Sequence, residues 1–364
     1  MVSETEFEIL SERIGSATGP EDIFGMLTGV GDKLTEVKRL YRNLSKTVHP
    51  DRNSRRKSDA DGAFKRLSEL FEKAKVRIEA GVYGSTVPDE TAEESFSIRV
   101  GDREYKISSR LAQGDLSTVY YGIDAMTERK IVLKLVDDPA DNDLMQNEIR
   151  TLRRLKENPG AQDKHLPMMI DRFKAEDGRQ ALILEMLDGY YDLVAIRESD
   201  RYRNGIPEQH VAWMLTRLLS VVGYVHSRGV IHGNIEPAHV MIRPRDHNLS
   251  LVDWSYAIGG QKAGERFKVL NEDYSPSEVA EGKPPLPSSD LYAVGKSMIY
   301  ALGGNVKTNR MPHGTTPGFA RFLEFLVRES PIQRAQDAWE MHKMLQDLRV
   351  ELWGPIRFLE FVLP

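Results

Sequence analysis

Two stretches near the N-terminus repeat apolar residues at intervals of three and four positions, the spacing of amphipathic helices. One stripe runs from Leu34 to Val48 and the other from Phe64 to Ile78, and basic side chains lie off the first stripe. Because each helix would bury its apolar face against the other, we expect an antiparallel helical hairpin. Pro50 disfavours helical geometry at the residue before it, so the first helix should end near Val48.

Beyond residue 96 the pattern changes to short runs of apolar, β-branched and aromatic residues, which are typical of strands. Strands are predicted at 96–100, 105–107, 119–121, 131–135 and 181–184. A helix is expected over 148–155, and after about residue 207 the pattern is mostly helical. A strand-rich part followed by a helix-rich part predicts an α+β domain with two lobes.

Residues 81–95 separate the two patterns and combine glycine, proline and acidic residues, so they are the predicted linker. We therefore predict a multidomain chain, with an all-α part over 1–80, a strand-rich lobe over 96–187 and a helix-rich lobe over 188–364. The C-terminal tail, 355–364, is apolar. We expect this tail to pack on the helix-rich lobe, with a docking strip or a dimer contact as the alternatives.

The chain has 364 residues, of which 40% are hydrophobic and 29% charged, and this balance indicates soluble globular domains rather than disorder. At roughly 100–200 residues per domain, the length suggests two or three domains. The absence of cysteine excludes disulfide scaffolds, thiolate metal sites and cysteine nucleophiles. No apolar run reaches the roughly 18 residues that a bilayer requires, and the first residues lack a basic segment followed by an apolar one. We therefore expect no membrane partner, no signal peptide and a cytoplasmic location.

The formal net charge of −5 argues against a chain-wide nucleic-acid surface, so we expect no nucleic-acid partner. Charge is nevertheless unevenly distributed near the N-terminus. Residues 1–32 carry seven acidic side chains and one basic one, whereas residues 33–80 carry fourteen basic and seven acidic ones. A local basic patch is therefore expected on the helical hairpin.

The loop between the two helical stripes contains the tripeptide His49-Pro50-Asp51, and Tyr41-Arg42 lies upstream on the basic helix. Together with Phe64 and Phe71 in the second helix, these residues resemble the J domain of DnaJ-type co-chaperones, over roughly residues 20–80. The alternative is a turn in which the proline only stops the helix. In that family the basic helix and the loop dock on a DnaK-type heat-shock chaperone and stimulate its ATP hydrolysis, so the resemblance implies this partner. The implied chaperone-binding residues are Tyr41, Arg42, Lys46, His49, Pro50 and Asp51.

The two-lobed region resembles the eukaryotic-type protein kinase fold from about residue 96 to 350. Lys134 matches the strand lysine that holds the phosphates, Glu148 matches its helix partner, and Asp253-Trp254-Ser255 matches the Asp-Phe-Gly segment. Only Gly114 remains of the glycines in the glycine-rich loop, so this loop should bind phosphates more weakly. The resemblance implies ATP and Mg²⁺ as ligands, with Asp253 holding the metal. The implied nucleotide-binding residues are Gly114, Val119, Lys134, Glu148, Glu185, Leu187 and Asp253.

The segment that matches the family's catalytic loop departs from the family pattern. Asn234 replaces the aspartate that accepts the substrate proton, and an amide has no basic carboxylate. Glu236 replaces a lysine near the transferred phosphoryl group, and His239 replaces an asparagine that binds magnesium. The proton acceptor, the positive group near the transferred phosphoryl group and one magnesium ligand are thus all replaced. We therefore interpret the domain as a pseudokinase and not an enzyme. No catalytic residue is expected in this degenerate loop, which comprises His232, Asn234, Glu236 and His239.

The first functional hypothesis is therefore an adaptor that acts as a co-chaperone. Its J domain would recruit and stimulate a DnaK-type chaperone ATPase, while the kinase-like scaffold binds a client or partner protein, with ATP as a further ligand. The alternative is an active protein Ser/Thr kinase, or another phosphotransferase, which the retained Lys134, Glu148 and Asp253 favour. A third hypothesis is ATP binding without turnover. The Lys134–Glu148 pair is also compatible with a structural ion pair that holds no nucleotide.

Overall fold

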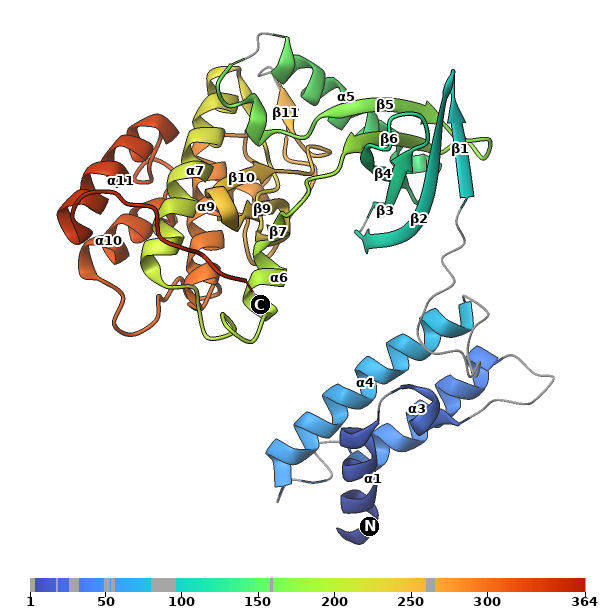
Figure 1. The fold of residues 1–364 in the computed structure, drawn as a ribbon. Helices are drawn as coiled ribbons and strands as arrows, with labels where there is room; N and C mark the ends of the chain where they lie inside the picture. The colour runs from blue at the N-terminus through green and yellow to red at the C-terminus, as the bar shows by residue number, and fades with distance from the viewer. Residues whose placement is uncertain are drawn as a thin grey trace. The chain divides into compact units, whose positions relative to one another are not determined.

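The computed structural model describes residues 4–17, 19–25, 33–48, 53, 56–79, 96–114, 116–157, 160–259 and 266–363. The chain divides into two compact units, Met1–Ala92 and Glu93–Pro364 (Figure 1). The predicted linker, 81–95, lies outside the described residues, and the predicted domain limits stay a prediction. No helix within the described residues is long and apolar enough to cross a membrane.

The N-terminal unit contains the predicted helical hairpin and a further helix packed against it (Figure 1). Its helices are α1 (Glu4–Ser16), α2 (Glu21–Phe24), α3 (Lys33–Val48) and α4 (Lys57–Glu79). The prediction of the hairpin is confirmed as α3 and α4, and α3 ends at Val48 as expected. Helix α1 was not predicted, yet it packs on both helices and buries Phe7 and Ile14 in their core.

The strand-rich part of the second unit is one antiparallel sheet with the order β1-β2-β3-β4-β6-β5 (Figure 1). Its strands are β1 (Phe96–Val100), β2 (Arg103–Gln113), β3 (Ser117–Asp124), β4 (Lys130–Val136), β5 (Met169–Lys174) and β6 (Gln180–Glu185). The predicted strands are confirmed, and β5, which pairs with β6, was missed. Strand side chains alternate between faces, so Ile131 and Leu133 enter the sheet core while Lys134 faces the other side.

One helix, α5 (Asn142–Lys156), packs against β6 on the side of the sheet that Lys134 faces. It contains the helix predicted over 148–155. Its buried positions include Met145, Glu148 and Ile149, which share one face because residues three and four apart on a helix are neighbours. The amphipathic pattern of α5 therefore carries Glu148 into the same buried space as Lys134.

The helix-rich part is built around two helices, α7 and α9, that are buried along most of their length. Its helices are α6 (Leu193–Glu198), α7 (Glu208–Ser227), α8 (Ser277–Ala280), α9 (Pro287–Leu302), α10 (Pro317–Leu326) and α11 (Ala338–Trp353). Short strands lie between the helices: β7 (Tyr191–Asp192), β8 (Val230–Ile231), β9 (Val240–Arg243), β10 (Asn248–Leu251) and β11 (Ile258–Gly259). A buried bidentate ion pair between Arg334 and Glu278 anchors α8, with N–O distances of 2.6 and 3.2 Å.

The C-terminal tail packs on the helix-rich part, as predicted from its apolar composition. Phe361 is only 4% exposed, and its ring stacks on Tyr202 with the centroids 5.0 Å apart. The Tyr202 hydroxyl donates to the carbonyl of Val362 over 3.0 Å. Phe358 also contacts an aromatic ring, that of His247, but remains 62% exposed. Phe361 is thus a core residue, and Phe358 lies on the surface.

We predict that Phe361→Ala lowers the free energy of unfolding by about 3 kcal/mol, because it removes a buried ring and leaves a cavity. The matched change Phe358→Ala should cost less than about 1 kcal/mol, since most of that ring is already in water. Denaturant unfolding followed by tryptophan fluorescence measures both changes. All four tryptophans of the chain lie in the second unit, so the signal reports that unit. Equal losses in the two variants would contradict the assignment.

Candidate functional site

Three charged side chains from separate elements meet where α5 faces the sheet. The ammonium of Lys134, on β4, lies 2.7 Å from the Glu148 carboxylate and 2.8 Å from the carboxylate of Asp253, which follows β10. Glu148 is 1% exposed and Lys134 is 10% exposed. Burial by itself lowers the pKa of Lys134, but the charges of Glu148 and Asp253 outweigh it and raise that pKa above its usual value. The lysine is therefore a fixed cation at neutral pH.

Helix α5 is also tied to the chain segment that follows Asp253. Glu148 accepts hydrogen bonds from the backbone N–H of Trp254 over 3.3 Å and from the Ser255 hydroxyl over 3.0 Å. The side-chain amide of Asn147 donates to the carbonyls of Ser255 and Ala257, over 3.0 and 2.7 Å. Two consecutive helix residues thus fix this segment.

The carboxylate of Asp253 is ionised and partly accessible to solvent. Burial would raise its pKa, but Lys134 and His239 hold that pKa well below the usual range. The side chain is 25% exposed, and one oxygen lies 3.3 Å from the ring Nε2 of His239. A carboxylate oxygen is the ligand that Mg²⁺ prefers, whereas an imidazole is a poor one. Asp253 therefore fits a magnesium ion that phosphates and water also coordinate, and His239 does not.

Within the described residues no group of three or more metal-ligating side chains could enclose a metal ion. A magnesium ion at Asp253 would thus depend on the nucleotide for most of its ligands, which is how this metal is usually held beside phosphates. Its chemistry there would be to offset the negative charge of the phosphate oxygens.

The backbone of the predicted catalytic loop is fixed by a buried carboxylate on α9. Asp290 accepts hydrogen bonds from the backbone N–H groups of His232 and Gly233, over 2.8 and 2.9 Å. His232 is fully buried, and its Nε2–H donates to the carbonyl of Val252 over 3.0 Å. Burial lowers the pKa of His232 to about 4, so the ring is neutral at neutral pH and acts as a structural link between two chain segments.

The two other replaced positions in the loop contact each other. Glu236 lies 3.4 Å from the Nε2 of His239, and its second oxygen accepts a hydrogen bond from the side-chain amide of Asn271. The Nδ1–H of His239 donates to the carbonyl of Asn234 over 2.8 Å, because a carbonyl can only accept. The same ring can therefore donate to Glu236 and Asp253 only when it carries both protons. His239 therefore links the predicted catalytic loop to the carboxylate of Asp253.

The other predicted nucleotide-binding residues lie around this cluster in the strand-rich part. Val119, on β3, pairs directly with Lys134 in the register of β3 and β4. Gly114 follows β2, and its N–H donates to the carbonyl of Ser117 over 3.0 Å. Glu185 ends β6, and Leu187 follows it in the segment that leads to the helix-rich part. These roles stay a prediction.

The predicted chaperone-binding residues on α3 divide into two kinds. The ring of Tyr41 stacks on Phe71 with the centroids 4.2 Å apart, and its hydroxyl is 3.0 Å from the Ser68 hydroxyl. Tyr41 is therefore used for packing within the hairpin. Arg42 and Lys46 are exposed on the same helix and fit the predicted basic patch. The remaining three lie outside the described residues: His49, Pro50 and Asp51.

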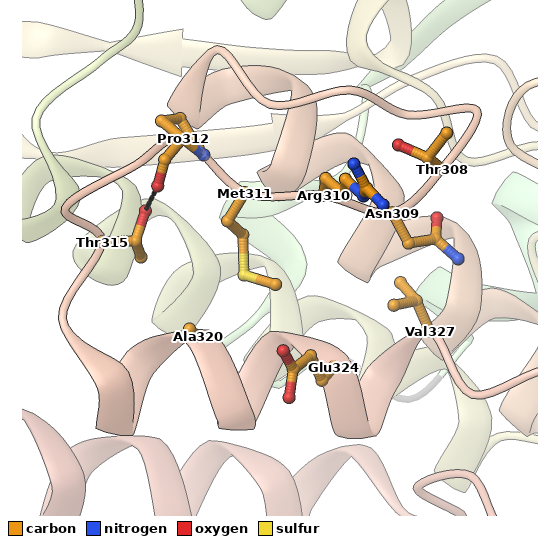
Figure 2. Close-up of a pocket in the computed structure, with 9 residues that line it drawn as sticks. All are labelled: Thr308, Asn309, Arg310, Met311, Pro312, Thr315, Ala320, Glu324 and Val327. Atoms are coloured by element: carbon orange, nitrogen blue, oxygen red, sulfur yellow. Dashed lines mark hydrogen bonds between the residues drawn. The ribbon is translucent and has the colours of Figure 1, made fainter.

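Sequence reasoning missed Asn147 and Asn271, which position Ser255 and Glu236 respectively. Each is a single polar residue outside any motif, so no local pattern identifies it. A cavity of about 570 Å³ lies elsewhere, between α10 and the loop over 308–315 (Figure 2). Figure 2 shows Glu324 and Arg310 beside it, and none of its lining residues was predicted as a site residue.

Two protein families match this chain. The family described as protein kinase domain matches residues 105–343, and the family described as DnaJ domain matches residues 30–73. Both resemblances inferred from the sequence, and the multidomain fold class, are thereby confirmed. Among curated relatives, serine/threonine-protein kinase PknL of Mycobacterium tuberculosis is 24% identical over 279 residues, which cover 70% of this chain and 68% of the relative.

Two cyanobacterial relatives have similar names. Serine/threonine-protein kinase PknA of Nostoc is 24% identical over 67% of this chain and 47% of the relative. Serine/threonine-protein kinase B of Synechocystis is 27% identical over 57% of this chain and 38% of the relative. This chain therefore covers less than half the length of these two relatives.

These relatives overturn the prediction that the domain is a pseudokinase and not an enzyme. All three are named Ser/Thr protein kinases, and the residues that match the protein kinase domain family, 105–343, include Lys134, Glu148 and Asp253. The prediction gave the side chain at position 234 too much weight. Phosphoryl transfer depends mainly on positioning and electrostatic stabilisation, with little covalent chemistry for the protein to perform.

We predict that the second unit loses stability as the pH falls from about 6.5 to about 4, in part through His232. The unfolded histidine binds a proton in this window, whereas burial lowers the pKa of the folded one to about 4. The contribution of this residue is at most about 3 kcal/mol. Denaturant unfolding at several pH values should show a shallower dependence for His232→Gln than for the unchanged chain. The exposed-site variant His313→Gln is the control, and a shallower dependence in that variant as well would contradict the assignment.

Proposed function

The chain belongs to the protein kinase domain family, and from this membership we propose that it is a protein serine/threonine kinase whose catalytic loop carries a non-standard set of side chains. One observation carries the proposal: the Lys134 ammonium lies within 2.8 Å of both Glu148 and Asp253. A buried cation beside an accessible carboxylate provides a contact for phosphates and a contact for magnesium. ATP and Mg²⁺ are accordingly the proposed cofactors.

The remaining nucleotide contacts that we propose surround this cluster. Gly114, which follows β2, and Val119, on β3, would lie over the phosphates. Glu185 and Leu187 would receive the base at the end of β6. Because only one glycine remains in the loop, fewer backbone N–H groups can approach the phosphates closely. We therefore propose that the binding of ATP depends more heavily on Lys134 in this chain than on the matching lysine in a kinase with a full glycine-rich loop.

The altered catalytic loop is compatible with this activity on physical grounds. The transferred phosphoryl group passes through a loose transition state, so correct placement of the two substrates supplies most of the catalysis. The negative charge of Glu236 would oppose the transfer if it were isolated. It lies instead beside His239 and accepts a hydrogen bond from Asn271, so its charge is partly offset.

The chain also carries a DnaJ domain, which supports a second part of the proposal. We propose that this domain recruits a DnaK-type chaperone and stimulates its ATP hydrolysis through His49-Pro50-Asp51 and the exposed Arg42 and Lys46. A cationic face of this kind accelerates association with an acidic protein surface. The chaperone, or a client protein that it holds, would then be brought to the kinase domain. A cytoplasmic location agrees with this partner and stays a prediction.

We predict that the full chain transfers phosphate from radiolabelled ATP to a mixed panel of protein substrates in the presence of magnesium. Lys134→Ala should reduce labelling by about 100-fold or more, because it removes the cation that holds the phosphates. Lys130→Ala is the matched control on the same strand, since its ammonium is exposed and pairs with Asp188. Labelling that does not exceed the Lys134→Ala background would refute the kinase proposal.

We predict separately that the full chain increases ATP hydrolysis by a purified DnaK-type chaperone, and that His49→Gln abolishes this increase. Tyr41→Phe should retain it, because the Tyr41 ring is used for packing on Phe71. Release of inorganic phosphate in single-turnover experiments measures the effect, with Lys134→Ala in the background to remove any contribution of the kinase domain. Unchanged stimulation by the His49→Gln variant would refute the co-chaperone part.

A further inference from the structure

Phosphoryl transfer to a hydroxyl group releases one proton, and the position that receives it in most kinases is an amide in this chain. The side-chain oxygen of Asn234 is a neutral hydrogen-bond acceptor and has no appreciable basicity. Its backbone is fixed as well, because its carbonyl accepts from His239 and its N–H lies 3.3 Å from the Nδ1 of His232. If the chain transfers phosphate, a general base in the usual sense would have to be another carboxylate near this loop.

Two carboxylates near the loop are already committed to other contacts. Asp290 is 2% exposed and accepts hydrogen bonds from the backbone of His232 and Gly233. Asp253 contacts Lys134 with one oxygen and His239 with the other, and it is the proposed magnesium ligand. A substrate hydroxyl cannot reach the first of these, and the second lies 2.8 Å from the Lys134 ammonium.

Glu236 differs from both in accessibility and in the number of its contacts. Its side chain is 23% exposed, and it lies only two positions after Asn234 in the same loop. Each of its oxygens has one contact in the structure, with His239 and with Asn271. A carboxylate oxygen has two lone-pair sites, so both oxygens keep the capacity to accept a further hydrogen bond.

The contacts of Glu236 also orient it. The next residues, Pro237–His239, form a single 3-10 turn whose proline restricts the backbone directly after Glu236. The amide of Asn271 reaches Glu236 from the segment before α8, so two separate chain segments hold this carboxylate. A proton acceptor that is held on two sides needs little reorganisation when the reaction occurs.

We propose that Glu236 is the proton acceptor of the phosphoryl transfer, in the role that Asn234 cannot fill; this inference rests on the proposed kinase activity. The hydroxyl oxygen of the substrate forms a bond to the γ-phosphorus of ATP. The bond between that phosphorus and the bridging oxygen breaks, and ADP leaves with the electron pair. The hydroxyl proton passes to a carboxylate oxygen of Glu236, which later releases it to water.

The test compares variants of the full chain, with radiolabelled ATP, magnesium and dephosphorylated casein as the probe substrate. Glu236→Gln should lower kcat by about 10²- to 10⁴-fold, the usual contribution of a general base. The KM for ATP and the rise in melting temperature caused by ATP should stay unchanged, because Glu236 does not hold the nucleotide. Adding Asn234→Asp to the Glu236→Gln variant should restore kcat at least tenfold. Glu272→Gln, an exposed glutamate near Asn271, is the matched control and should have no effect.

Each outcome decides the inference. If the unchanged chain transfers phosphate and Glu236→Gln does so within about threefold, the role of Glu236 is refuted and the kinase proposal stands. A loss in Glu236→Gln that Asn234→Asp does not restore shows a positioning role and also refutes it. Asn234→Asp alone gives a measurement that does not need the Glu236→Gln variant to fold: a gain above about 100-fold would show that no effective acceptor existed. Absence of transfer by the unchanged chain refutes the proposed function, and this inference with it.

Discussion

A lysine ammonium removed from water is stable only when opposite charges and hydrogen bonds compensate it, and this constraint organises the second unit. Lys134 meets Glu148 at 2.7 Å and Asp253 at 2.8 Å, and these three residues belong to a strand, a helix and a loop of the helix-rich part. Removing any one of them would leave a buried charge without its partner. The packing of α5 between the sheet and the segment after β10 therefore depends on this cluster as much as on apolar contacts.

A second buried carboxylate, that of Asp290, fixes the backbone of the predicted catalytic loop. Asp290 binds the backbone of His232 and Gly233, and the neutral ring of His232 binds the next segment. The course of the loop is thus fixed by the contacts of Asp290 and His232. Side chains such as Asn234 and Glu236 can differ from the common pattern without disturbing the fold. The fold and the chemistry of this loop are therefore separable, which explains how unusual residues occur in an intact scaffold.

This separation explains why reasoning from motifs gave the wrong answer about enzymatic activity. A motif compares side chains one position at a time, and three replaced positions suggested three lost functions. In the structure two of these positions, Glu236 and His239, contact each other, and His239 also contacts Asp253. The replaced residues form a connected group rather than isolated defects. The relatives of this chain are named Ser/Thr protein kinases.

The sequence by itself determined the features that depend on local patterns. Apolar periodicity located α3 and α4, Pro50 predicted the end of α3 near Val48, and runs of apolar, β-branched and aromatic residues located most strands of the sheet. Neighbouring residues decide these properties. Only the tertiary structure decided that α1 completes the first core, that Asn147 ties α5 to the segment after Asp253, and that Phe361 is buried while Phe358 is exposed. A local pattern shows which face of an element is apolar or charged. It does not show which distant group meets that face, because this depends on how the whole chain packs.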